Sequence, residues 1–251
     1  MKVGIVGAMP EEMEKVLSVV EDRSLCERGN RVYYQGRLCG VDIVAVFSRW
    51  GKVAAATTVT NLIVEFGVDR IFFTGIAGGL VEGVNIGDVV VGHHLFQHDM
   101  DARPNLRRFE IPLTGKTSFE VSPDQLELSK TAVFNFLKDH ADFRRTLRDA
   151  GIESPLIHVG DIASGDLFIG SSAMRKALNR NLPSVLCADM ESAAAAQVCY
   201  DYHVPFAVVR AISDQADEHA EDASGEFVIR HGGDYALGIV TEYLKLCSHG
   251  A

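Results

Sequence analysis

The sequence predicts an α/β protein in which a mixed or parallel sheet is covered by helices on both faces. Short runs rich in β-branched residues alternate with segments of helical periodicity, and the predicted strands have apolar cores, as strands buried on both faces do. A length of 251 residues suits one such domain, and neither an internal repeat nor a linker rich in Pro, Gly or Ser divides the chain. We therefore predict a single domain over residues 1–251.

The first half is predicted to begin with a strand at Lys2–Gly7 and a helix from Pro10 to Val20. Proline is favoured in the first turn of a helix, and the apolar residues of this segment recur at helical spacing. A hairpin around Cys39-Gly40, an Ala- and Val-rich helix and two further strands complete this half: Arg31–Leu38, Val41–Phe47, Lys52–Phe66, Arg70–Gly75 and Asp88–Gly92.

The second half continues the alternation of the two patterns. Apolar runs predict three strands, and helical periodicity predicts four helices before a long final one. The predicted strands are Leu156–Ala163, Ser184–Met190 and Phe206–Ile212, and the predicted helices are Pro123–Asp139, Phe143–Ala150, Ser172–Asn181, Glu191–Asp201 and a closing helix from about Asp222 to Cys247.

Composition excludes several classes of partner and location. There are 24 Lys and Arg against 34 Asp and Glu, a net charge of −10, which argues against binding to nucleic acid or to an anionic membrane. The chain shows neither a signal-peptide pattern nor an apolar run of about 18 residues that could span a membrane. Five scattered cysteines without a C-x-x-C pair indicate reduced thiols, so we expect a cytoplasmic protein.

The common cofactor and hydrolase motifs are missing from the sequence. It contains no G-x-G-x-x-G after a strand, no P-loop, no H-E-x-x-H and no G-x-S-x-G. His93 and His94 are adjacent on a predicted strand, where alternation would point their rings in opposite directions. We therefore expect neither a metal site nor an organic cofactor.

Charged and small residues gather where four predicted strands end. Ligands of open α/β sheets bind beyond the carboxyl ends of strands, so these residues are expected to share one edge. Helix-dipole complementarity could explain Glu11, Glu12 and Glu191 singly, but it does not explain a carboxylate and an arginine within apolar strand sequence. Acid, base and hydroxyl-binding carboxylates suit cleavage of a glycosidic bond. The strand-end residues are Met9, Glu11, Glu12, the turn Gly75-Ile76-Ala77-Gly78-Gly79, Asp189, Met190, Glu191, Arg210, Ser213 and Asp214.

The same segments resemble the 5′-methylthioadenosine/S-adenosylhomocysteine nucleosidases of the purine nucleoside phosphorylase superfamily. The resemblance runs in order from residue 1 to about residue 230 and implies a three-layer αβα fold with a central mixed sheet. It is carried by Gly4-Ile5-Val6-Gly7-Ala8-Met9-Pro10-Glu11-Glu12, Gly51-Lys52-Val53-Ala54-Ala55-Ala56, Thr74-Gly75-Ile76-Ala77-Gly78-Gly79, Gly87-Asp88-Val89-Val90-Val91, Ser164-Gly165-Asp166-Leu167-Phe168-Ile169, Met190-Glu191 and Arg210-Ala211-Ile212-Ser213-Asp214.

The resemblance implies a role for each matching residue. Asp214 would protonate adenine N7, and Glu12 would activate the attacking water, with Arg210 near that water. Glu191 and the Met190 backbone would hold the ribose hydroxyls. Adenine would bind Phe168 and the Ile169 backbone, the 5′-alkylthio group would lie against Met9, Trp50 and Phe227, and Ile76, Asp189 and Ser213 would also contact the substrate. The segment Asp99–Pro112 would come from a second subunit, which implies a homodimer.

Three departures from the family pattern leave the substrate open. Ile76 stands where a small hydroxyl residue is usual, Asp189 where the family has Glu, and Arg49-Trp50 where a small and an aliphatic residue are usual. The alternatives are a phosphorylase that uses phosphate, a futalosine-type hydrolase, a preference for 5′-deoxyadenosine, and a nucleoside-binding module without activity. Phosphorylases of this superfamily carry an Arg just before the glycine turn, where this chain has Phe72-Phe73-Thr74, so water is the expected nucleophile.

Overall fold

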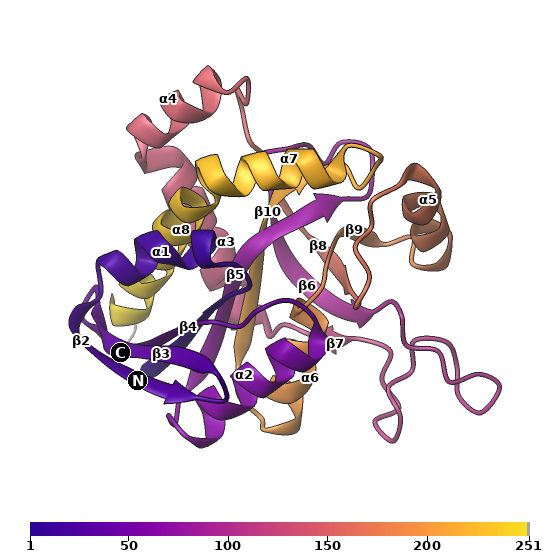
Figure 1. The fold of residues 1–251 in the computed structure, drawn as a ribbon, viewed down its shortest axis with the longest axis horizontal. Coiled ribbons are helices and arrows are strands. Elements are labelled where there is room, and N and C mark those ends of the chain that lie inside the picture. The colour runs from indigo at the N-terminus through magenta and orange to yellow at the C-terminus, as the bar shows by residue number, and fades with distance from the viewer. Residues whose placement is uncertain (250–251) are drawn as a thin grey trace.

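The computed structural model, which describes residues 1–249, is built on a ten-stranded mixed sheet between two helical layers (Figure 1). This confirms the predicted α/β class and its mixed sheet. Strands follow one another in the order β10-β6-β8-β9-β5-β1-β4-β3-β2, and β7 pairs with β6. The strands are β1 (Lys2–Gly7), β2 (Glu21–Arg28), β3 (Arg31–Leu38), β4 (Val41–Phe47), β5 (Arg70–Gly79), β6 (Val89–Gln97), β7 (Phe119–Glu120), β8 (Ile157–Ser164), β9 (Val185–Asp189) and β10 (Phe206–Asp214).

Part of the sheet closes on itself. In addition to its contact with β6, β10 pairs in parallel with β5, so the path from β10 through β6, β8, β9 and β5 returns to β10. The strand β9 meets β5 in antiparallel orientation at only two positions, Gly78 opposite Ala188 and Gly79 opposite Cys187. This short crossing brings the ends of β5 and β9 together with the end of β10.

The helices cover the two faces of the sheet (Figure 1). One layer contains α8 with α1 and α3 packed on it, and the other contains α2 and α6. The layers bury separate apolar clusters against the two faces. The helices are α1 (Pro10–Ser18), α2 (Lys52–Val64), α3 (Pro123–Asp139), α4 (Ala141–Asp149), α5 (Ser172–Asn181), α6 (Ser192–Asp201), α7 (Ala220–Phe227), a π-helical turn η1 (Val228–Gly232) and α8 (Gly233–His249).

Several details differ from the sequence prediction, among them the short strand β7, which was not predicted. The strand β2 was not predicted because its residues are almost all exposed and therefore lack an apolar pattern. The glycine run 75–79, predicted as a turn, belongs to β5, where β10 pairs with it. The strand β6 continues to Gln97, well beyond the predicted end at Gly92. The predicted final helix starts earlier, at Ala220, and contains the π-helical turn.

The predicted hairpin around Cys39-Gly40 is confirmed. Both residues have positive φ, 53° and 77°, which is the backbone of the tight turns that join twisted antiparallel strands. No helix in the described part of the chain is long and apolar enough to cross a membrane.

Candidate active site

A cavity of about 610 Å³ lies where β1, β5, β9 and β10 end. This volume is typical of a small-molecule site. Its lining is mainly apolar, with four carboxylates at or shortly after the strand ends and one from α7. The lining residues are Ala8, Met9, Glu12, Trp50, Ile76, Ala77, Gly78, Leu167, Phe168, Ile169, Ala188, Asp189, Met190, Glu191, Ser213, Asp214, Glu221, Ser224 and Gly225.

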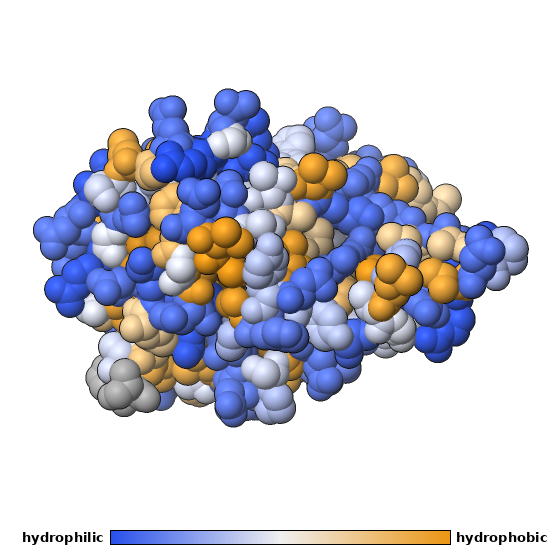
Figure 2. Space-filling view, turned by 90° about the horizontal axis from the view of Figure 1, so that it is seen from below, coloured by the Kyte–Doolittle hydropathy of each residue, from blue (hydrophilic) through white to orange (hydrophobic). Residues whose placement is uncertain are grey.

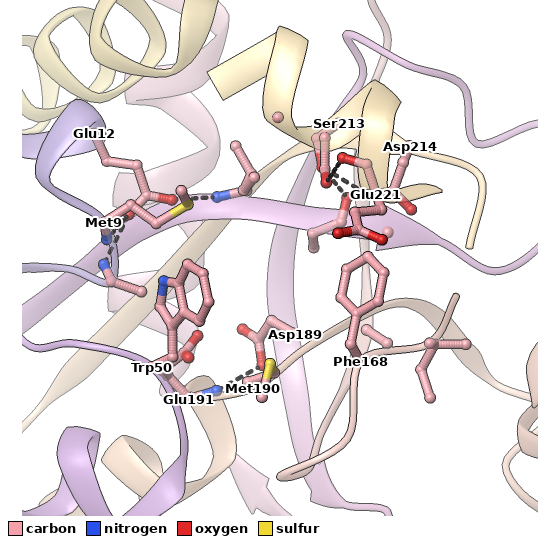
Figure 3. A pocket seen from close by; sticks show the side chains of 18 of the residues that line it. Met9, Glu12, Trp50, Phe168, Asp189, Met190, Glu191, Ser213, Asp214 and Glu221 are labelled. Carbon is pink, nitrogen blue, oxygen red and sulfur yellow. Dashed lines mark hydrogen bonds between the residues drawn. The ribbon is translucent and has the colours of Figure 1, made fainter. Parts of the chain in front are cut away.

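Two ends of this cavity differ in their residues (Figure 3). At one end, which we call the Glu12 end, Glu12 lies with Met9, Trp50 and Glu191. At the other, the Asp214 end, Asp214 lies with Ser213, Glu221 and the ring of Phe168. Trp50 and Phe168 are large aromatic side chains with exposed fractions of 64% and 47%, so each offers a free ring face to a ligand.

Glu12 is held by three backbone amides. It lies in the first turn of α1, where its Oε2 accepts hydrogen bonds from the N–H groups of Ala8 (2.7 Å) and Met9 (2.9 Å), and its Oε1 accepts one from Ile76 (3.0 Å). Burial raises the pKa of Glu12, while the Arg210 charge and the three amides oppose that rise. The carboxylate is therefore fixed in position at the cavity wall.

Arg210 and Asp189 form a buried ion pair at the cavity wall, which Asp189 lines and behind which Arg210 lies. Arg210 is fully buried, and its Nε donates to Asp189 Oδ2 at 2.7 Å. Its Nη1 donates to the Thr74 carbonyl (3.1 Å) and its Nη2 to Ser192 Oγ (2.8 Å), and the guanidinium lies over the Phe73 ring. Asp189 also accepts hydrogen bonds from the hydroxyls of Ser164 and Ser192 and from the N–H groups of Glu191 and Ser192. These contacts satisfy the arginine and the aspartate within the protein.

Glu191 reaches the cavity from the residue that precedes α6. Its Oε1 accepts a hydrogen bond from Gly51 N–H at 2.9 Å, and its Oε2 lies 4.0 Å from Arg210 Nη2. Burial and the nearby Asp189 charge raise its pKa to about 8, against the attraction of Arg210. The carboxyl group is therefore able to hold a proton near neutral pH.

Asp214 lies at the end of β10, and unlike Asp189 and Glu191 it is not close to Arg210. Its Oδ1 accepts a hydrogen bond from Ala216 N–H and its Oδ2 one from Ser213 Oγ, both at 2.8 Å. Burial raises the pKa of this carboxyl above its ordinary value, and these hydrogen bonds only partly offset the rise. A carboxylic acid with a raised pKa is suited to donate a proton near neutral pH.

Most of the residues predicted for the site line this one cavity. They come from segments far apart in the sequence and are Met9, Glu12, Trp50, Ile76, Phe168, Ile169, Asp189, Met190, Glu191, Ser213 and Asp214. Arg210 lies behind the wall and touches it through Asp189.

Phe227 is the predicted site residue that the structure places elsewhere. It is buried in the core, where its ring packs against His231 and Tyr235, and it is not part of the cavity lining. The residues of α7 that do line the cavity are Glu221, Ser224 and Gly225, which the sequence prediction missed. Their spacing of three and four positions on one helix was the signal that could have found them.

Cationic side chains are absent from the described lining of the cavity. Arg49, which comes just before the lining residue Trp50, donates from Nη2 to the Asn30 carbonyl at 2.6 Å and is not part of the lining. Phe72 and Phe73, which precede the glycine run, are fully buried core residues. The cavity therefore offers carboxylates and apolar surface, which are poor partners for a phosphate dianion.

Comparison with known proteins gives consistent matches over nearly the whole chain. Residues 2–245 match the family model described as the phosphorylase superfamily. A 5′-methylthioadenosine/S-adenosylhomocysteine nucleosidase of Haemophilus influenzae (strain PittEE) is 36% identical over 230 residues, which cover 91% of this chain and 92% of the relative.

Solved structures agree with these sequence matches. The corresponding nucleosidase of Neisseria meningitidis, solved in complex with methylthio-immucillin-A, has a TM-score of 0.85 and 31% identity, and the match covers 97% of this chain and 98% of that one. A futalosine hydrolase of Helicobacter pylori has a TM-score of 0.81 and 29% identity, over 100% of this chain and 98% of that one. This chain therefore belongs to the phosphorylase superfamily and, within it, to the family of the 5′-methylthioadenosine/S-adenosylhomocysteine nucleosidases.

Proposed function

We propose that this protein hydrolyses the N-glycosidic bond of 5′-methylthioadenosine and S-adenosylhomocysteine, releasing adenine and a 5-substituted ribose. The observation that carries the proposal is the pairing of Glu12 and Asp214 at opposite ends of one cavity, among whose described lining residues there is no cationic side chain. Such a cavity has one carboxyl group to protonate the leaving base and another to activate water. Its described lining has no cation to bind phosphate.

In the proposed mechanism the base binds at the Asp214 end, against the exposed ring of Phe168. Asp214 donates its proton to the purine as the bond to ribose breaks, because an unprotonated purine is a poor leaving group. Burial supports this role, since it raises the pKa of Asp214 and keeps the proton available at higher pH.

Water and the sugar bind at the Glu12 end. Glu12 orients and deprotonates the attacking water, and the three amides that hold its oxygens keep it in position for that step. Glu191 accepts hydrogen bonds from the ribose hydroxyls. Arg210 does not reach the substrate in this scheme; it positions Asp189 and the start of α6, from which Glu191 projects.

One assay tests the nucleophile and the substrate together. Purified protein is incubated with 5′-methylthioadenosine, S-adenosylhomocysteine, 5′-deoxyadenosine or futalosine, each with and without phosphate, and the free base and the sugar product are measured. We expect base release without phosphate from the first two nucleosides. A requirement for phosphate, with a ribose 1-phosphate as product, would show that the protein is a phosphorylase.

Futalosine is included because a specific observation favours it as the second candidate. The futalosine hydrolase of Helicobacter pylori matches this chain over its whole length. Faster release of base from futalosine than from 5′-methylthioadenosine would assign the protein to that reaction.

We also propose a homodimer in which segment 99–112 of one subunit completes the cavity of the other. Figure 1 shows the connection between β6 and β7 extending away from the sheet. The apolar residues Phe109 and Ile111 of this segment are buried within their own chain, so they supply no surface for a partner. Leu113 does support it, since its side chain is fully exposed next to this segment.

A second apolar surface suits the same assembly. Figure 2 shows the face on the α2 side of the molecule, where apolar side chains lie among polar ones, and α2 exposes Val53 and Val64. Analytical ultracentrifugation of the wild type and of Leu113→Asp tests the proposal. We expect a dimer that the substitution weakens, and a fully active monomer at micromolar concentration would contradict it.

The proposed location is the cytoplasm. All five cysteines are free thiols in the structure, and a reducing compartment maintains that state.

A further inference from the structure

A β-bulge in β6 places the rings of His93 and His94 side by side. Gly92 pairs with Gly160 and Leu95 with Ile162, so His93 and His94 together lie opposite a single residue of β8. Strand alternation fails at such an extra residue. The two ring centroids are 4.0 Å apart, so the prediction that the rings point in opposite directions is wrong.

The short strand β7 adds a carboxylate to this pair. Glu120 pairs with His94 across the strands, and its Oε1 lies 3.7 Å from His93 Nε2. One ligand atom from each of His93, His94 and Glu120 lies within 4.8 Å of the other two. The histidine side chains are about one-third exposed and Glu120 is 62% exposed, so an ion can reach them from solvent.

Asp161 orients one of the two rings. Its Oδ1 lies 3.1 Å from His94 Nδ1 and accepts a further hydrogen bond from His94 N–H at 3.3 Å. A proton on Nδ1 shared with Asp161 leaves the lone pair of His94 Nε2 available. Histidines that bind metals commonly have their second ring nitrogen held by a carboxylate in this manner.

We propose that His93, His94 and Glu120 bind one divalent transition-metal ion of the zinc type. Two imidazoles and a carboxylate, with water as the remaining ligand, are a donor set that Zn²⁺ accepts. In a tetrahedral Zn²⁺ site the ligand atoms are roughly 3.3 Å apart, so a contraction of at most about 1.5 Å closes the site. The exposed side chain of Glu120 is free to make that movement.

The ion fastens β7 to β6 and takes no part in bond cleavage. None of its three ligands lines the cavity. Only two residues of β7 pair with β6, and β7 follows the connection that contains segment 99–112. A metal bridge between the strands therefore anchors the end of that connection, and it stabilises the folded chain because the ligands converge only there.

The test uses the untagged, full-length chain after treatment with chelator, so that no affinity tag contributes histidines. Zn²⁺ is titrated calorimetrically, and Co²⁺ is used as a spectroscopic probe of the coordination geometry. We expect one ion per chain, the absorption of tetrahedral Co²⁺, and a rise in Tm of roughly 5–10 °C at 100-fold excess over Kd.

Four variants separate this site from general surface binding. We expect His93→Ala and His94→Ala to abolish binding, and Asp161→Asn to weaken it about 10- to 100-fold. His140→Ala is the matched control, because His140 also lies beside a carboxylate, 3.5 Å from Glu242, but outside the cluster. Three results would each overturn the proposal. They are Zn²⁺ binding that survives in both ligand variants, an equal loss of binding in the His140→Ala control, and no detectable binding to the wild type at micromolar Zn²⁺.

Discussion

At the scale of single residues, Asp214 shows how position and chemistry combine. It follows the buried strand β10, accepts hydrogen bonds from Ala216 N–H and Ser213 Oγ, and has a raised pKa because it is buried. Asparagine has nearly the same shape and can still donate a hydrogen bond to a bound purine. It cannot transfer a proton, so the substitution separates binding from catalysis.

We expect Asp214→Asn to lower kcat by about 10²–10⁴-fold with a smaller effect on KM, which is the range of general acid catalysis. The matched control is Asp222→Asn, an exposed carboxylate on α7 outside the cavity, which should retain wild-type kinetics. Steady-state rates and Tm are measured on the same preparations. A loss in kcat of less than about threefold, which is far smaller than general acid catalysis contributes, would refute the acid role.

At the residue level, an unusual charge at a strand end was the signal that predicted residues which the structure brings together. Glu12, Glu191 and Asp214 were predicted in this way, and all three line the cavity. It failed at Phe227, because hydrophobicity alone cannot distinguish an apolar residue that faces a ligand from one that faces the core. The helix α7 lines the cavity at Glu221 and Ser224 and has entered the core by Phe227.

At the scale of elements, the glycine run of β5 allows charged side chains to lie directly against the backbone of the strand. A Cβ on Gly75 would collide with Arg210 Nη1 and lie 2.8 Å from Glu12 Oε1. Both groups are held by other partners, so neither can move aside cheaply. Three glycines in five residues predicted a turn, and the sequence could not show that pairing with β10 keeps the run extended.

We expect Gly75→Ala to lower the stability by about 1–3 kcal/mol, the usual cost of overpacking, and to reduce kcat because Glu12 is displaced. Thermal unfolding and steady-state kinetics measure the two effects. The control is Gly225→Ala in α7, whose Cβ would meet no atom within 4 Å. That change should leave Tm equal or higher, since alanine is favoured over glycine within helices. Wild-type Tm and kcat in Gly75→Ala would contradict the proposed crowding.

At the scale of the whole molecule, the order of strands and helices could be predicted, but the closure of the sheet could not. Alternating patterns locate elements, whereas the pairing of β10 with both β5 and β6 depends on contacts distant in sequence. That closure brings the end of β9 beside the ends of β5 and β10, although β9 runs antiparallel to β5. The expected meeting of the strand ends is therefore correct, but parallel alignment alone does not produce it.

The same closure buries several carboxyl groups together, and this makes stability depend on pH. Burial raises the pKa of Glu12, Glu191 and Asp214 above their ordinary values. The folded chain therefore holds protons that the unfolded chain has already released. Because the folded state binds more protons, the free energy of unfolding falls as pH rises through this window. For Glu191 the window extends from about 4.5 to about 8.

We expect Glu191→Gln to flatten this decline, because glutamine keeps the acceptor for Gly51 N–H and has no charge to desolvate. We compare the free energy of unfolding of the variant with that of the wild type at each pH. From the bottom to the top of the window, the difference should change by about 2–4 kcal/mol in favour of the variant. The activity of the variant should fall. Urea unfolding at a series of pH values measures the free energies. Glu218→Gln is the control, since hydrogen bonds from Ser172 lower the pKa of that exposed carboxyl, so its contribution is gained by the bottom of the window and adds no slope towards its top. If Glu191→Gln and Glu218→Gln follow the wild-type slope equally, the proton is not held at Glu191.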